Sequence, residues 1–146
     1  MGFGLPAAIG AQLGKPDSTV FCIDGDGSVQ MTLIELATAA HYNIPIKVAV
    51  LDNNFLGMVR QWQELFYQKR YSSVEIGTSN PDFMKLAEGL GALALKAERP
   101  EEVRPVLDRA INHPGPVLMQ FCVAKEDNVY PMVPAGHAID EMIDMA

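Results

Sequence analysis

Two short polar clusters carry the residue types that bind phosphates and metal ions. They are the run Gly25, Asp26, Gly27 and Ser28, and the pair Asn53 and Asn54. Glycines let the backbone approach a ligand closely, the amides at the start of a following helix attract an anion, and a carboxylate such as Asp26 binds a hard cation. Asn53 adds a neutral oxygen ligand. Together the clusters predict a magnesium ion that bridges the oxygens of a diphosphate.

Each cluster follows a segment typical of a buried parallel strand. Residues 19–23 and 46–51 are apolar and rich in β-branched side chains, as expected of strands that are covered on both faces. Between them, residues 31–42 show the helical spacing of apolar side chains. One helix and one return strand bring Asn53 to the neighbouring strand end, beside Asp26. Open parallel sheets bind their ligands at this edge.

The rest of the chain continues the alternation of helices and strands. Further strands are predicted over residues 93–97 and 117–123, and further helices over residues 6–13, 57–67, 80–88, 100–112 and 139–145. Thr32 and Glu35 are spaced as a capping box for the helix over residues 31–42. The alternation predicts an α/β fold with a doubly wound, mainly parallel sheet and helices on both faces. We expect a domain over residues 1–127 and a C-terminal tail over residues 128–146 that forms a lid on the active site.

Composition excludes several classes of function. The 146 residues and 49% hydrophobic content fit one packed domain. A formal charge of −7 provides no basic surface for nucleic acid, and no apolar run approaches the ~20 residues that span a bilayer. Cys22 and Cys122 lie in apolar strands, so we expect neither a disulfide nor a thiolate metal site. These features predict a cytoplasmic location.

Three other interpretations fit parts of the pattern. Residues 2–7 match the dinucleotide fingerprint GxGxxA, but no strand precedes them in this sequence. Residues 24–35 match the odd positions and the final Glu of an EF-hand loop, but Val29 stands where that loop needs glycine. Taken singly, residues 25–28 and residues 53–54 also fit ordinary turns between a strand and a helix.

The combination of motifs is more specific than its parts. The GDG sequence, one helix and strand, and then the Asn pair resemble the cofactor motif of thiamine diphosphate enzymes. Residues 1–8, 23–28 and 57–63 are similar to the catalytic large subunit of acetolactate synthase, also called acetohydroxyacid synthase. The likeness covers essentially the whole chain, as the C-terminal, diphosphate-binding domain of that enzyme.

The resemblance implies roles for residues 25–28, for Asn53 and for Phe55. Asp26 and Asn53 would be side-chain magnesium ligands, and Phe55 would offer its backbone carbonyl as a third ligand. Backbone donors to the diphosphate would come from Gly25, Gly27 and Ser28.

Three further side chains receive roles from the resemblance. Met1 would lie near the aminopyrimidine and hold the coenzyme bent, and Met58 would contact the cofactor. Met58 and Trp62 would line the route of the substrate and select the second 2-keto acid. From the sequence alone, packing explains Met58 and Trp62 better than a substrate contact does.

The implied reaction decarboxylates pyruvate on thiamine diphosphate and condenses the two-carbon unit with a second 2-keto acid, in branched-chain amino acid biosynthesis. The family's catalytic glutamate belongs to an N-terminal pyrimidine-binding domain of a partner subunit, and no catalytic residue is expected in this chain. The FAD-binding domain is not found in this sequence either. We therefore expect the chain alone to bind the cofactor weakly and to be inactive.

The implied full subunit is a homodimer or homotetramer, with a regulatory small subunit as a further partner. Two alternatives remain at this point. The chain could be a domain of another thiamine diphosphate-dependent decarboxylase or carboligase, or a non-catalytic binding or assembly module that keeps the fold.

Overall fold

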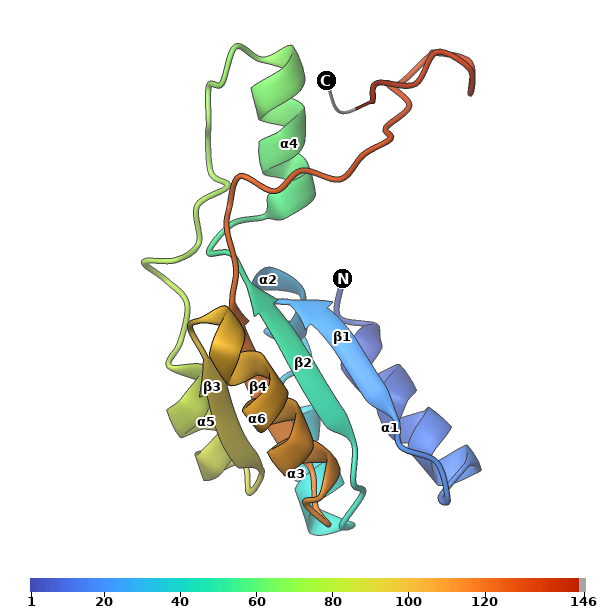
Figure 1. Cartoon of the computed structure of the whole chain (residues 1–146), viewed down its shortest axis with the longest axis vertical. Coiled ribbons are helices and arrows are strands. Elements are labelled where there is room, and N and C mark those ends of the chain that lie inside the picture. Colours follow the sequence, from blue (N-terminus) through green and yellow to red (C-terminus); the bar gives the residue numbers. More distant parts are fainter. Residues whose placement is uncertain (145–146) are drawn as a thin grey trace.

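Four parallel strands form the single sheet of the computed structural model, which describes residues 1–144 (Figure 1). The strands are β1 (Phe21–Gly25), β2 (Lys47–Asp52), β3 (Leu93–Ala97) and β4 (Val117–Cys122), in the order β1-β2-β4-β3. All neighbouring strands are parallel, so the carboxyl ends of β1 and β2 meet at one edge of the sheet. The predicted α/β fold with a parallel sheet is confirmed.

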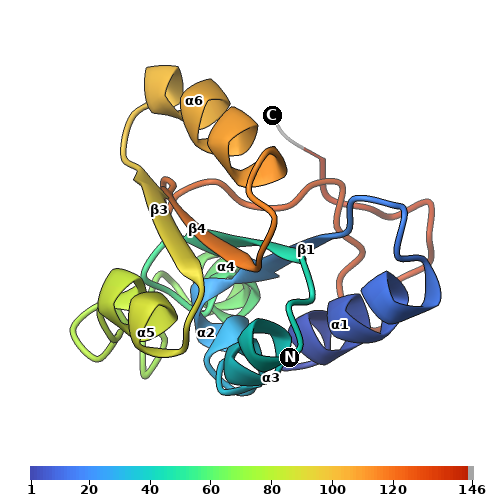
Figure 2. The same ribbon diagram turned by 90° about the horizontal axis from the view of Figure 1, so that it is seen from below.

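Helices cover both faces of the sheet, as Figure 2 shows from below. They are α1 (Gly4–Gly14), α2 (Asp26–Val29), α3 (Glu35–His41), α4 (Gly57–Phe66), α5 (Phe83–Gly89) and α6 (Pro100–Ile111). α1, α3 and α5 lie on one face, and α6 lies alone on the other. α4 and the loop after it project beyond the strand ends, above the sheet in Figure 1.

The two faces have separate hydrophobic cores. On the side of α1, α3 and α5, the fully buried Leu36, Val48 and Phe83 belong to one cluster. On the side of α6, Ala110 packs in a second cluster with Met119 and other side chains of β3 and β4. Burial of apolar area in these layers stabilises the fold and fixes the positions of the strand ends.

The α6 face of the sheet is covered over only half of its width. Strand register places Ile23 of β1 opposite Ala49 of β2, and Leu51 lies two residues beyond Ala49 on the same face. Ala49 is buried, whereas Ile23 is 71% exposed and Leu51 is 43% exposed. The β1 side of this face therefore presents apolar side chains that no described element covers.

The helix expected over residues 31–42 is shorter than its periodicity indicates, because α3 begins only at Glu35. Before it, Met31, Thr32 and Glu35 donate backbone hydrogen bonds to the residues three positions earlier, which is a tighter winding than an α-helix. The predicted capping box is also wrong: the Thr32 hydroxyl donates to the carbonyl of Gly2 at 3.1 Å.

The C-terminal helix expected over residues 139–145 is wrong for its described part. Residues 139–141 form a turn and a bend, and Met132 pairs with Ile143 in an isolated antiparallel bridge. Two backbone hydrogen bonds of 2.7 and 2.9 Å between these residues hold the bridge. Residue 145 lies outside the described residues. Within residues 1–144, no helix is both long and apolar enough to cross a membrane.

Candidate active site

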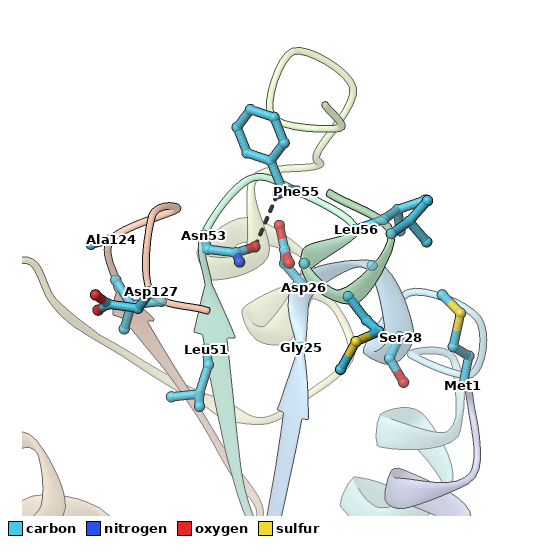
Figure 3. Close-up of a pocket in the computed structure, with 15 residues that line it drawn as sticks. Met1, Gly25, Asp26, Ser28, Leu51, Asn53, Phe55, Leu56, Ala124 and Asp127 are labelled. Carbon is cyan, nitrogen blue, oxygen red and sulfur yellow. Dashed lines mark hydrogen bonds between the residues drawn. The ribbon is translucent and has the colours of Figure 1, made fainter. Parts of the chain in front are cut away.

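A cavity of about 560 Å³ lies at the carboxyl ends of β1 and β2 (Figure 3). The structure brings eight of the nine predicted site residues to its wall, namely Met1, Gly25, Asp26, Gly27, Ser28, Asn53, Phe55 and Met58. They come from the N-terminal segment, from the end of β1 and the turn after it, from the turn after β2 and from the first turn of α4. The cavity therefore unites segments that are far apart in the sequence, at the edge where the sheet geometry predicts a ligand.

Asp26 is the deepest charged group of this cavity. It is the first residue of α2 and is only 1% exposed. Burial raises the pKa of its carboxyl to about 6, although a hydrogen bond from Asn80 opposes that shift, and the nearby carboxylate of Asp52 adds to it. The start of the helix differs from the sequence-based expectation. The helix was expected after Ser28, whereas α2 begins at Asp26.

Asn53 and Phe55 form a tight turn at the end of β2. The backbone N–H of Phe55 donates to Oδ1 of Asn53 at 3.0 Å, the bond drawn in Figure 3. The Asn53 side chain and the Asp26 carboxylate lie beside each other there, while the Phe55 ring points away from them. An amide oxygen has two lone pairs, so this bond leaves Asn53 Oδ1 an acceptor site for a cation.

The Phe55 ring is held on the outer side of the turn by two cations. Arg60 lies over it at 5.5 Å from the ring centroid, and Lys125 lies at the same distance. Arg60 is itself buried and paired with Glu64 at 2.8 Å. These contacts fix the ring, so that only the backbone of Phe55 remains to serve the cavity.

A second loop buttresses the turn. Asn54 adopts the left-handed conformation, with φ of 62°. Its carbonyl accepts hydrogen bonds from the backbone N–H groups of Ile76 and Gly77, at 2.9 and 3.1 Å. A β-carbon on Gly77 would lie 2.7 Å from the side chain of Asn54. Glycine at position 77 thus permits the close approach of the two loops.

Ser28 ties the N-terminal segment to the cavity. Its Oγ accepts a hydrogen bond of 3.1 Å from the backbone N–H of Gly2, which has φ of +72°. Met1 is thereby placed at the rim of the cavity, where its side chain is largely exposed. This placement agrees with a wall contact for Met1, and its role toward a coenzyme stays a prediction.

Met58 and Trp62 lie one helical turn apart on α4 but at different hollows. Met58 is half-exposed on the wall of the main cavity. Trp62 lines a neighbouring cavity of about 440 Å³ and packs against Phe66, with 5.2 Å between the ring centroids. Val59 lines both cavities. The structure thus separates Trp62 from the main site, and its role in substrate choice stays a prediction.

Sequence reasoning missed two residues that support the turns at the ends of β1 and β2. Asn80 donates to Asp26, and Asp52 is buried with 6% exposure at the end of β2. Oδ2 of Asp52 accepts a hydrogen bond of 2.6 Å from Gln120, and Oδ1 accepts one of 3.1 Å from the backbone N–H of Asn54. The Asn80-Pro81-Asp82 sequence reads as the start of a helix, so no local signal indicates that Asn80 reaches the site.

The donor set fits a magnesium ion better than a transition metal. A carboxylate, an amide oxygen and a backbone carbonyl are hard oxygen ligands, which Mg²⁺ supplements with water and phosphate oxygens. Asp26 and Asp52 are buried, and no ion pair involves either of them in residues 1–144. Residues 1–144 also contain no group of three His, Cys, Asp or Glu side chains that could hold a metal ion by themselves. In the described residues, no cationic side chain thus pairs with these carboxylates, and the site has none of the soft ligands of zinc or copper.

A parallel α/β sheet with this cavity at its strand ends defines a cofactor-binding domain of the doubly wound class. The family described as "Thiamine pyrophosphate enzyme, C-terminal TPP binding domain" matches residues 1–121. The chain belongs to this family, and the resemblance to thiamine diphosphate enzymes is confirmed.

Individual relatives show which members of the family the chain is similar to. The chain is 52% identical to an acetolactate synthase of Mycobacterium avium, over 97% of this chain and 24% of that protein. It is 46% identical to the acetolactate synthase isozyme 2 large subunit of Escherichia coli, over 99% of this chain and 26% of that protein. The chain thus spans about a quarter of the length of these relatives.

A solved structure shares the fold. It is the thiamine diphosphate-dependent 4-hydroxybenzoylformate decarboxylase of Rhodococcus jostii, which superposes with a TM-score of 0.79 at 31% sequence identity. The match covers 85% of this chain and 23% of that chain. The same domain therefore occurs in an enzyme with a different activity, so the fold alone does not select the reaction.

Proposed function

We propose that the chain is the diphosphate-binding part of an acetolactate synthase. The observation that carries the proposal is the cavity at the ends of β1 and β2, in which buried Asp26, Asn53 and the backbone of Phe55 come together. The identity of 44–52% to named acetolactate synthases, over nearly the whole chain, supports the choice of reaction. The substrates would be pyruvate and a second 2-keto acid.

In this proposal the residues of the chain bind and orient the cofactor. Asp26, Asn53 and the Phe55 carbonyl would hold Mg²⁺, and the backbone at Gly25 and Ser28 would face the diphosphate. Thiamine diphosphate, when bound, supplies the electron sink that lets a 2-keto acid lose its carboxyl group. Space is available at Gly25, since a β-carbon there would meet nothing within 4 Å.

Gly27 serves packing as well as ligand approach. A β-carbon at Gly27 would lie 2.9 Å from Leu56 Cδ2 and 3.0 Å from Ile76 Cδ1. The absence of a side chain therefore lets the turn after β1 pack against the loops that follow β2. Of the two glycines, only Gly25 has free space around the position of a β-carbon.

The remaining elements of the activity would come from other domains and other subunits. The catalytic glutamate and the FAD site would belong to other domains, and the full subunit would form a homodimer or homotetramer with a regulatory small subunit. The uncovered apolar strip of Ile23 and Leu51 supports association with another protein surface. The tail over residues 128–146 would form a lid on the active site. The protein would be cytoplasmic.

A chimeric enzyme tests the proposal. This chain replaces the matching quarter of the Mycobacterium avium enzyme, and acetolactate is measured with pyruvate, Mg²⁺ and thiamine diphosphate. We expect acetolactate formation from the chimera, and a loss of at least about tenfold after Asp26→Ala because a metal ligand is removed. Release of carbon dioxide without acetolactate would favour a simple decarboxylase. A folded chimera with neither product would contradict the proposal.

A further inference from the structure

Asn80 lies between two buried carboxylates at the carboxyl ends of β1 and β2. Its Nδ2 donates a hydrogen bond of 2.8 Å to Oδ2 of Asp26. The same nitrogen lies 3.5 Å from Oδ1 of Asp52 and 3.5 Å from Oδ1 of Asn54. An Asn amide nitrogen carries two hydrogens, so it can serve Asp26 and a second acceptor together. Asn80 thus links the turn after β1 to the end of β2.

A second amide fixes which way the Asn80 side chain faces. Nε2 of Gln30 donates to Oδ1 of Asn80 at 2.8 Å and to the backbone carbonyl of Asp26 at 3.0 Å. If the Asn80 amide were reversed, its oxygen would face the Asp26 carboxylate and its nitrogen would face another donor. Gln30 therefore holds the Asn80 donor toward Asp26.

The backbone of Asn80 is anchored by the helix that follows it. Asp82 caps α5, because its Oδ1 accepts hydrogen bonds of 3.1 Å from the backbone N–H groups of Met84 and Lys85. Phe83, the first residue of α5, is 1% exposed in the core beneath the sheet. Asn80 thus projects from the fixed start of a packed helix, and its amide does not have to be ordered when a ligand binds.

We propose that Asn80 is a positioning residue for Asp26, and that it holds the carboxylate in the orientation that binds Mg²⁺. The inference rests on the proposed function, because Asp26 is the proposed metal ligand. With Oδ2 engaged by Asn80, the carboxylate cannot rotate freely, and its remaining lone pairs keep one direction. The amide also contacts both Asp26 and Asp52 without adding a positive charge that would repel a cation.

Calorimetric titration of Mg²⁺ into the chain, at saturating thiamine diphosphate, tests this role. We expect Asn80→Ala to weaken the apparent Mg²⁺ affinity by about 10–100-fold, as for other residues that orient a metal ligand. Gln30→Ala should cause a smaller loss. The double variant should resemble Asn80→Ala alone, because Gln30 acts through Asn80.

Asn112→Ala is the matched control. Asn112 follows α6, and its Nδ2 donates to the backbone carbonyl of Asp108 at 2.7 Å, away from the cavity. The Mg²⁺ affinity of the Asn112→Ala variant should equal that of the parent chain. Thermal unfolding without Mg²⁺ shows whether each variant is folded. A merely structural role for Asn80 would lower the unfolding midpoint and leave the affinity of the folded protein unchanged.

The outcomes separate the two claims. A parent chain that binds Mg²⁺ and thiamine diphosphate, together with parent-like affinity in folded Asn80→Ala, would overturn the role of Asn80 and leave the proposed function intact. A parent chain that binds neither would overturn both. If Asn80→Ala does not fold, Gln30→Ala decides, since it leaves Asn80 in place and removes the hydrogen bonds of Gln30 to Oδ1 of Asn80 and to the Asp26 carbonyl. Parent-like affinity in that folded variant would count against the role.

Discussion

Gln61 forms two hydrogen bonds with the backbone of Val129, which lies 68 positions later in the chain. Its Nε2 donates to the Val129 carbonyl at 2.9 Å, and its Oε1 accepts from the Val129 N–H at 2.8 Å. Gln61 is 1% exposed, and it is buried in the middle of α4. The Gln61 amide pairs with the Val129 backbone as the backbone of a neighbouring strand would. It thereby fixes the start of the C-terminal tail beside α4 (Figure 1).

Gln61→Ala should release this part of the tail. Two backbone groups of Val129 lose their protein partners, and each such loss costs about 1–3 kcal/mol if the group stays buried. The tail is expected to move into solvent instead, so the Val129 amide should exchange with deuterium faster than in the parent chain. Hydrogen exchange followed by mass spectrometry measures this rate.

Gln63→Ala provides the control on the same helix. Gln63 binds the backbone of Ser72 in the same two-bond manner, at 3.1 and 2.8 Å. That variant should speed exchange at Ser72 and leave Val129 unchanged. Equal protection of Val129 in the parent chain and in Gln61→Ala would show that Gln61 does not hold the tail.

Gly77→Ala should destabilise the turn that carries Asn53. The new β-carbon would meet the Asn54 side chain at 2.7 Å, and Asn54 is constrained by its positive φ. Overpacking of this kind costs about 1–3 kcal/mol. Urea unfolding should therefore show a lower free energy of unfolding, and thiamine diphosphate binding should weaken with it.

Gly10 is the control for Gly77, because a side chain at position 10 has space and should stabilise the chain instead of destabilising it. Gly10 lies at an exposed position of α1, and a β-carbon there would meet nothing within 4 Å. Gly10→Ala should raise the free energy of unfolding by roughly 0.5–1 kcal/mol, because alanine favours a helix. If both glycine variants were equally stable, the close contact of Gly77 with Asn54 would be refuted.

The two cysteines should differ in their rates of alkylation. Both are free thiols, and Cys22 is buried in β1 while Cys122 is exposed at the end of β4. Burial, followed by the negative charge of Asp24, raises the pKa of Cys22 to about 11, and burial also raises the pKa of Cys122. Only the thiolate reacts, so a raised pKa lowers the reactive fraction at neutral pH.

Iodoacetamide labelling between pH 7 and 9, read by peptide mass spectrometry, measures this difference. The Cys122 rate should rise by about tenfold for each pH unit while the pH stays below its pKa. Cys22 should react only after unfolding in urea. Labelling of Cys22 in the folded chain as fast as that of Cys122 would contradict the packing of β1 against α1.

The strands were predictable because their signal is local. Residues 93–97 match β3, and the predictions for β2 and β4 differ by one residue at their ends. Continuous apolar runs between turn residues specify buried strands, whatever their neighbours are. The helix over residues 31–42 was overestimated since apolar periodicity does not distinguish an α-helix from the tighter turns that precede Glu35.

The site was predictable only as far as motifs and strand ends specify it. The proximity of Asp26 and Asn53 followed from the predicted strands alone, because neighbouring parallel strands end at the same edge of the sheet. Asn80 and Gln61 depend on hydrogen bonds that span 54 and 68 positions. A single sequence contains no periodicity or spacing that reports such contacts. The tail bridge between Met132 and Ile143 was missed for the same reason.

The central claim is that Asp26 anchors magnesium and thiamine diphosphate in the cavity at the strand ends. Thermal unfolding of the chain with and without both ligands tests it most directly. Binding to the folded state at 100 times the dissociation constant stabilises by about 2.7 kcal/mol, so the midpoint of the parent chain should rise. Asp17→Ala, an exposed control, should show the same rise, and Asp26→Ala should show little or none. An unchanged midpoint for the parent chain, or an equal rise in Asp26→Ala, would contradict the claim.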